Sequence, residues 1–170
     1  MTKHKKSVCE PKHFEALFNT HSTLLRNYIY YKCGDFDLAE DMVQEAFIRL
    51  WNTCEKVNYD EALFYLKRIA NNTFLNTIKH QKVVLNYNKF IGPEINNESP
   101  EFIFEEKEFM KKLQDSIADL PEKQREVFLL NRIDKMTYKE IAALLNISIK
   151  AVEKRMHNAL VVLRKKIGPI

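Results

Sequence analysis

The scarcity of turn-forming residues is the feature that most limits what this chain can fold into. Its 170 residues include only three glycines and five prolines. Sheet proteins need many tight turns, which depend on these residues, whereas long helices need few connections. Apolar residues instead recur at helical spacing along most of the chain. We therefore expect an all-α protein.

The first half of the sequence predicts three helices that close around one core. Apolar spacing indicates a helix over residues 13–31, and a second helix that begins with Asp37 as its N-cap, with Glu40 completing a capping box. A loop is expected over residues 52–60. A third helix is expected over residues 61–81.

A break in this periodicity separates two domains. Residues 87–100 are rich in Asn and contain Gly92-Pro93 and Ser99-Pro100, a composition typical of a linker. We therefore expect two small helical domains, at residues 8–84 and 104–170, joined by an acidic flexible linker at residues 85–103.

The C-terminal domain carries a helix-turn-helix pattern. In residues 137–148 (TYKEIAALLNIS), Thr137 and Glu140 are spaced as a capping box, and Asn146 tolerates the left-handed backbone of a tight turn. Ser148 is a suitable N-cap for the next helix. A short helix, a turn and a capped second helix are typical of DNA-binding proteins.

The second helix of this motif has an apolar and a polar face. The apolar side is predicted to be Ile149, Val152, Met156, Ala159, Leu160 and Leu163, with Ile141, Ala142 and Leu145 inward on the preceding helix. Because the N-terminal part of a recognition helix meets base edges in the major groove, we expect DNA contacts from Lys150, Ala151, Lys154, Arg155, His157 and Asn158. A plain helical hairpin with solvated lysines is the alternative.

Two further surfaces are expected in the first half. The outer face of the second helix carries Asp41, Gln44, Glu45 and Ile48. Carboxylates beside an outward isoleucine suggest a protein partner with basic charge. The third helix shows the opposite charge and suits nucleic acid. Its outer face is predicted to carry Arg68, Asn71, Asn72, Lys79 and Lys82, with Phe64 and Leu75 also outward.

Other functional classes find little support in the residues. Cys9, Cys33 and Cys54 have neither disulfide-framework nor metal-ligand spacing, and are expected to be three isolated thiols in a reducing cytoplasm. No metal site, cofactor, secretory signal or membrane-spanning segment is expected. A carboxylate-based helical enzyme is disfavoured because no His lies near Asp37 or Asp41, and no phosphate loop or activated nucleophile is visible.

Four segments, in order, resemble the extracytoplasmic function (ECF) group of the sigma-70 family of bacterial sigma factors. Residues 38–47 (LAEDMVQEAF) are similar to the polymerase-binding segment. Residues 64–72 (FYLKRIANN) resemble the helix that follows it. Residues 120–128 (LPEKQREVF) and the helix-turn-helix are similar to the C-terminal domain of the group.

This resemblance implies a transcription initiation factor without enzymatic activity. Core RNA polymerase would meet Asp41, Gln44, Glu45 and Ile48, with Phe47 packing inward, and the C-terminal domain would bind the −35 promoter element as duplex. An anti-sigma protein is implied as a further partner, with the factor monomeric when free or in a 1:1 complex. The melted −10 element would meet Asn58, Tyr59, Tyr65, Arg68, Asn71, Asn72 and Lys79. Ala151 departs from the family pattern, which often has Thr there.

A conventional regulator that binds an operator as a dimer, without joining polymerase, is the main alternative. The acidic second helix with its outward Ile48 argues against it. So does the lack of an apolar heptad seam that would form a dimer.

Overall fold

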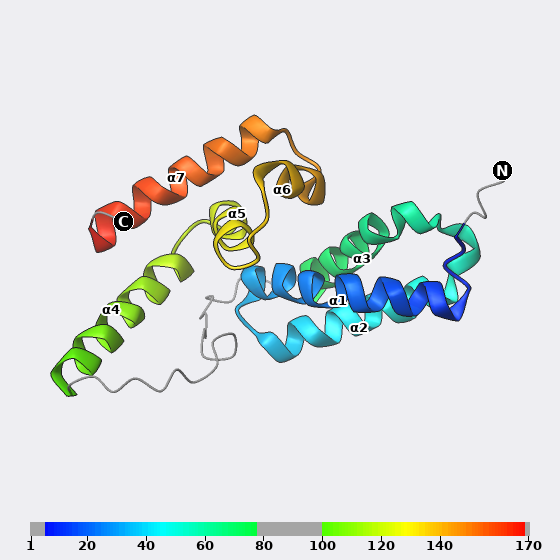
Figure 1. The fold of residues 1–170 in the computed structure, drawn as a ribbon, viewed down its shortest axis with the longest axis horizontal. Coiled ribbons are helices and arrows are strands. Elements are labelled where there is room, and N and C mark those ends of the chain that lie inside the picture. Colours follow the sequence, from blue (N-terminus) through cyan, green and yellow to red (C-terminus); the bar gives the residue numbers. More distant parts are fainter. Residues whose placement is uncertain (1–5, 78–99, 169–170) are drawn as a thin grey trace. The chain divides into compact units, whose positions relative to one another are not determined.

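The computed structural model describes residues 6–77 and 100–168, with side chains from residue 107 onward in the second range. The described residues form seven α-helices and two short 3₁₀ turns, and they include no strand (Figure 1). The prediction of an all-α protein is confirmed. The chain divides into two compact units, Met1–Lys82 and Val83–Ile170, and each is described by itself.

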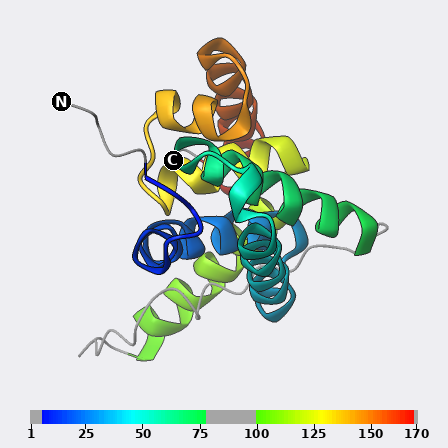
Figure 2. The same cartoon turned by 90° about the vertical axis from the view of Figure 1, so that its right-hand side faces the viewer.

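Unit 1 is a three-helix assembly. It contains α1 (Pro11–Cys33), α2 (Phe36–Asn52) and α3 (Ala62–Thr77). The three helices lie side by side, with α2 running opposite to both of its neighbours (Figures 1 and 2). Two 3₁₀ turns, η1 (Cys54–Lys56) and η2 (Tyr59–Glu61), connect α2 to α3. The core is formed by apolar side chains from all three helices, among them Leu25, Ile29, Met42, Phe47, Leu50, Leu66 and Phe74.

The junction between α1 and α2 differs from the prediction by two residues. Gly34 adopts a left-handed backbone with φ of 72° and ends α1. The N-cap of α2 is Asp35, whose carboxylate accepts a hydrogen bond from the Leu38 N–H at 3.0 Å. The prediction of Asp37 as the N-cap is therefore wrong, and so is the capping box with Glu40, because Leu38 occupies the third position after the cap. Asp37 lies in the first turn, where a carboxylate interacts favourably with the helix dipole.

The prediction of three isolated thiols is also wrong. Cys9 and Cys54 form a disulfide, although 45 residues separate them in the sequence. The reason is the antiparallel α1–α2 pair. Cys9 directly precedes α1 and Cys54 directly follows α2, so the pairing of these helices brings the two cysteines together. Cys33 is buried and retains its thiol.

Unit 2 contains four helices. These are α4 (Pro100–Ala118), α5 (Glu122–Arg132), α6 (Tyr138–Leu145) and α7 (Ile149–Ile167). α7 packs against each of the other three. The Arg125 guanidinium is buried and donates hydrogen bonds to the carbonyls of Ala118 and Leu120, at 2.6 and 3.0 Å. These bonds satisfy the carbonyls where α4 ends and fix the turn into α5.

The predicted inward faces of α6 and α7 need two corrections. Leu144, rather than Leu145, is fully buried beside Ile141 and Ala142. Ile149 is 45 % exposed because it is the first residue of α7, beyond the reach of the core. Of the other residues of α7 predicted to face inward, four are buried, namely Val152, Met156, Ala159 and Leu163, and Leu160 is half-buried.

Part of the predicted organisation lies outside the described residues. This applies to residues 85–99 of the predicted linker, residues 78–81 of the third predicted helix, and the candidate contacts Lys79 and Lys82. Helix α4 begins at Pro100, so residues 100–103 of the predicted linker are helical.

Candidate functional site

The outer face of α2 presents the carboxylates and apolar group that the sequence predicts. Asp41, Gln44 and Ile48 are exposed, and Ile48 has 61 % of its surface accessible. Glu45 is half-buried and forms an ion pair with Arg49, one turn further along the helix. Spacings of three and four residues place these side chains on one stripe.

Aromatic residues extend this stripe beyond the predicted set. Trp51, three residues after Ile48, is 43 % exposed, and Phe18 of α1 is 42 % exposed. Both pack at the rim of an aromatic cluster. Phe14 contacts the Trp51 ring at 4.9 Å between centroids, and Phe18 contacts the buried Phe47 ring at 5.0 Å. Continuing the α2 stripe by one turn in the sequence would have identified Trp51.

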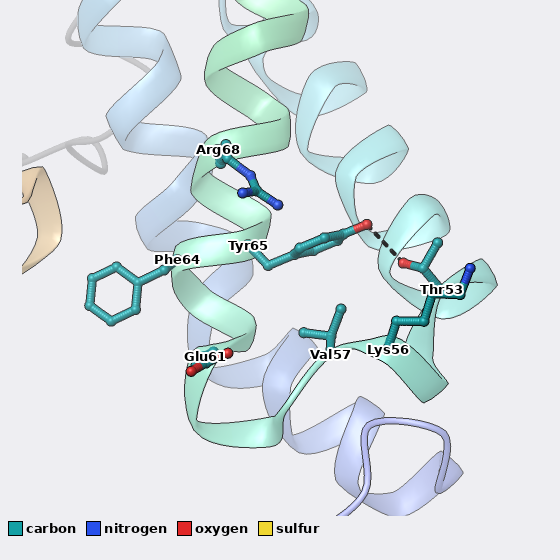
Figure 3. A pocket seen from close by; sticks show the side chains of 7 residues that line it. All are labelled: Thr53, Lys56, Val57, Glu61, Phe64, Tyr65 and Arg68. Carbon is teal, nitrogen blue, oxygen red and sulfur yellow. Dashed lines mark hydrogen bonds between the residues drawn. The ribbon is translucent and has the colours of Figure 1, made fainter.

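A pocket lies where the α2–α3 connection meets α3 (Figure 3). Its volume of about 580 Å³ is sufficient for a planar organic group such as a nucleobase. The connection contributes the residues that the sequence did not single out. The lining consists of Thr53, Lys56, Val57, Glu61, Phe64, Tyr65 and Arg68.

The pocket combines an aromatic wall with two cationic side chains, Lys56 and Arg68, and one carboxylate, Glu61. The Tyr65 hydroxyl lies 2.8 Å from the Thr53 hydroxyl, so the ring is fixed across the pocket (Figure 3). The Arg68 guanidinium lies 5.5 Å from the centre of the Tyr65 ring. Lys56 is exposed, and Phe64, 48 % exposed, points away from the other lining side chains (Figure 3). An aromatic face beside cations suits a nucleobase and its phosphate.

The structure brings some of the predicted −10 residues together and separates others. Tyr65 and Arg68 line the pocket, whereas Asn58 and Tyr59 do not. The Tyr59 ring contacts His13 at 5.6 Å between centroids, and the Lys6 ammonium lies 5.0 Å from its centre. Asn71 is half-buried and accepts a hydrogen bond from the Tyr28 hydroxyl at 3.4 Å, while Asn72 is exposed.

The helix-turn-helix has the local structure that the sequence predicts. Thr137 and Glu140 form a reciprocal capping box, and these hydrogen bonds, led by that from the Thr137 N–H, lower the pKa of Glu140. Asn146 adopts the left-handed backbone, with φ of 53°. The Ser148 hydroxyl accepts a hydrogen bond from the Ala151 N–H at 3.2 Å and caps α7.

The solvent side of α7 presents every predicted DNA-contacting residue. Lys150, Lys154 and His157 are exposed, and Ala151, Arg155 and Asn158 are half-buried. Ile149, the first residue of α7, is exposed as well, although it continues the stripe of the buried Val152 and Met156 and not the polar face. Lys150, Lys154 and Arg155 lie in the N-terminal half of α7. This is the part of a recognition helix that contacts bases. Near the other end, Lys166 forms an ion pair with Asp119 at 2.8 Å.

Other kinds of site find no support in the part of the chain that the structure describes. Among the described side chains, those of residues 6–77 and 107–168, there is no cluster of three or more His, Cys, Asp or Glu that could hold a metal ion. Within the same ranges, no helix is long and apolar enough to cross a membrane.

Comparisons with known families match both units. Residues 17–83 match the model of sigma-70 region 2, and residues 110–163 match the model of sigma-70 region 4. The ECF RNA polymerase sigma factor SigM of Bacillus subtilis is 32% identical over 117 residues, covering 67% of this chain and 70% of SigM. The ferric citrate uptake sigma factor FecI of Escherichia coli is 28% identical, with 86% of each chain covered.

Solved structures show the same fold. The sigma factor RpoE of Bartonella quintana, crystallised with the anti-sigma factor NepR, superposes with a TM-score of 0.58 at 17% identity, covering 91% of this chain and 96% of RpoE. CnrH, in complex with the cytosolic domain of CnrY, gives a TM-score of 0.56 at 23% identity, covering 89% of this chain and 85% of CnrH. The two family models and the identity with SigM show that the chain belongs to the ECF group of the sigma-70 family.

Proposed function

We propose that this chain binds core RNA polymerase and directs promoter-specific initiation by recognising −10 and −35 elements. The observation that carries this proposal is the pair of different surfaces on neighbouring helices of unit 1. One is the exposed acidic and apolar stripe of α2, and the other is the aromatic and cationic pocket beside α3. An operator-binding regulator needs neither of them.

The α2 stripe is the polymerase-binding surface. Asp41, Gln44 and Glu45 meet a basic surface, and Ile48 adds apolar area that is buried on association. Trp51 extends the apolar part, and aromatic residues of this size often dominate interface energies. Ile48 and Trp51 are both exposed in the free protein, and neighbouring exposed apolar side chains are typical of a surface that a partner covers.

The pocket holds an unpaired base of the −10 element. A base removed from the stack needs a planar surface to replace its lost neighbours, and the Tyr65 ring supplies one. Arg68 and Lys56 supply positive charge for the adjoining phosphates. Asn58, Tyr59, Asn71, Asn72 and Lys79 remain predicted contacts for neighbouring nucleotides.

The N-terminal part of α7 enters the major groove of the −35 element. Lys150, Lys154 and Arg155 lie within the first two turns, where side chains reach base edges. Ala151 offers a small apolar contact for a thymine methyl group. His157 and Asn158, one turn further on, are within reach of the phosphates.

The partners and the place of action follow from the same proposal. The factor acts where core polymerase and chromosomal DNA are found, in the cytoplasm, without a catalytic reaction of its own. An anti-sigma protein that covers the α2 stripe would keep it inactive, in a 1:1 complex. The similar sigma factor RpoE was solved with the anti-sigma factor NepR bound, and CnrH was solved with the cytosolic domain of CnrY bound.

Run-off transcription tests the proposal. Purified core polymerase is combined with this protein on fragments of the source genome, and start sites are mapped. We expect discrete start sites that appear only when both components are present, preceded by two shared sequence elements. Transcription that does not depend on the added protein, or a protein that fails to bind core polymerase in a pull-down, would contradict it.

A further inference from the structure

The segment that precedes α1 is held against the α2–α3 connection. Cys9 and Cys54 are joined by the disulfide, and Ser7 pairs with Asn58 in an antiparallel bridge. Val8, between these two contacts, is only 1 % exposed. We name residues 6–10 the strap, and its contacts with the connection come from Lys6, Ser7 and Cys9.

The strap also engages Tyr59, the aromatic residue of the connection that does not line the pocket. Lys6 lies over its ring, and His13 of α1 meets its edge. The His13 ring nitrogen lies 3.1 Å from the Ser7 carbonyl, which ties the strap to the start of α1. None of these noncovalent contacts involves the sulfur atoms of Cys9 and Cys54.

The disulfide is placed where it controls one wall of the pocket. Cys54 is the first residue of η1, which ends at Lys56, and Thr53 and Lys56 both line the pocket. The Lys56 N–H donates to the Thr53 carbonyl at 2.9 Å, so the backbone on both sides of Cys54 forms one turn. Fixing the Cys54 sulfur to the strap therefore restricts the movement of Thr53 and Lys56.

A disulfide at this place needs an explanation if the factor acts in the cytoplasm, and this part of the inference rests on the proposed function. Cytoplasmic disulfides are uncommon, and those that occur are mostly transient, with catalytic or redox-sensing roles. Cys9 and Cys54 are both half-buried, so small molecules can reach them. Buried Cys33, in contrast, is shielded.

We propose that Cys9 and Cys54 form a reversible oxidation site that responds to low-molecular-weight disulfides and orders the base-binding pocket when oxidised. The thiolate of one cysteine attacks a sulfur of the small disulfide, which forms a mixed disulfide and releases one small thiolate. The thiolate of the other cysteine then attacks the protein sulfur of that bond, closes the Cys9–Cys54 disulfide and releases the second small thiolate. The protein loses two electrons, and the small disulfide gains them.

The first experiment measures the pairing itself. The full-length protein is equilibrated with glutathione at a series of reduced-to-oxidised ratios, trapped by alkylation under denaturing conditions, and mapped by mass spectrometry. We expect Cys9 and Cys54 to lose alkylation together in one reversible transition, while Cys33 stays alkylated throughout. Pairing that involves Cys33, or no pairing at any ratio, would overturn the proposal.

The second experiment measures order in the connection without reference to transcription. Amide hydrogen exchange of residues 53–61 is compared between the oxidised and reduced wild-type protein. We expect oxidation to slow exchange there, by roughly tenfold, if the disulfide restrains local opening. C9S and C54S should match the reduced protein under both conditions, and C33S should respond like the wild type. Equal exchange in both redox states would overturn the ordering role.

The third experiment connects the site to function. Run-off transcription is measured with core polymerase and oxidised or reduced factor, at limiting factor concentration. We expect roughly fivefold more product from the oxidised form, because a pre-ordered pocket raises the fraction of binding-competent molecules. C33S should retain this difference, and C9S should lose it. Activity without a redox difference would overturn this inference alone, whereas no transcription in either state would overturn the proposed function.

Discussion

Tyr65 illustrates how one residue serves both the fold of unit 1 and its pocket. Its hydroxyl group meets Thr53, and the Thr53 hydroxyl also lies 2.7 Å from the Arg49 carbonyl at the end of α2. The ring itself forms the aromatic wall of the pocket. The hydroxyl therefore contributes to the position of the connection, and the ring contributes to binding.

Two substitutions separate these roles. Tyr65→Phe removes one partly buried hydrogen bond, so the free energy of unfolding should fall by about 1 kcal/mol while promoter opening is largely kept. Tyr65→Ala also removes the stacking surface, and promoter opening should fall by roughly tenfold or more. Permanganate reactivity of −10 thymines measures opening. Equal opening by Tyr65→Ala and Tyr65→Phe would exclude the ring from base binding.

Lys154 and Lys166 provide a matched pair on α7. Lys154 is exposed in the N-terminal half of the helix, whereas Lys166 lies near its end and pairs with Asp119. Lys154→Ala should weaken binding of the −35 duplex roughly tenfold and relax its base preference, because a side chain near base edges carries sequence information. Lys166→Ala should leave the preference unchanged. Selection from a randomised −35 library measures both, and an unchanged preference in Lys154→Ala would contradict the assignment.

Among the helical elements, the helix-turn-helix depends on two capped helices joined by three residues, of which Asn146 has a left-handed backbone. α6 has only eight residues and is too short to be stable by itself. Thr137→Ala removes its N-cap and should lower the stability of unit 2 by about 1 kcal/mol. Urea unfolding of the full chain, followed by a probe in unit 2, measures this, and an unchanged midpoint would contradict the capping role.

Glu140 gives this cap a pH dependence. Its folded pKa lies below the ordinary value of 4.5, first because of the hydrogen bond from the Thr137 backbone. The ionised Glu140 therefore stabilises the folded state above about pH 4.5, and this stabilisation is lost as the pH falls through the lower folded pKa. Glu140→Gln should be less stable than the wild type at pH 7, and the difference should narrow in acid. A difference in stability that does not change with pH would contradict this.

Helix ends can be predicted from the sequence when the residues that decide them are close together in the chain. The caps at Thr137 and Ser148, and the left-handed Asn146, depend on neighbours within a few residues, and all three predictions are confirmed. The N-cap of α2 was misplaced because two aspartates, Asp35 and Asp37, lie close enough to compete for it. Local pattern cannot decide between them when the exact end of α1 is unknown.

The pocket and the disulfide could not be predicted for a different reason. Both depend on the α2–α3 connection, in which η1 and η2 have little sequence signature. Tyr65 and Arg68 were found because they lie on a helix, whereas Thr53 and Val57 line the pocket only through the turns. The cysteine pair required knowledge that the start of α1 lies beside the end of α2.

At the scale of the whole molecule, the disulfide belongs to one unit only. It closes a loop of 45 residues within unit 1, so reduction should destabilise that unit by up to about 4 kcal/mol. The melting temperature of unit 1 should fall by roughly 10 °C or more, and that of unit 2 should stay the same. Calorimetry with and without reductant measures this, with C33S as the control. A shift of both units would contradict their independence.

Affinity for core polymerase depends on the α2 stripe if that stripe is the polymerase-binding surface. The dissociation constant is measured for the wild type, for the double variant Asp41→Lys/Glu45→Lys, and for Glu15→Lys as an exposed charge-reversal control on α1. We expect the double variant to bind roughly tenfold more weakly or worse, because two carboxylates that attract basic groups of the polymerase are replaced by ammonium groups that repel them. Glu15→Lys should bind like the wild type. Unchanged binding by the double variant would contradict the assignment of the α2 stripe to the polymerase.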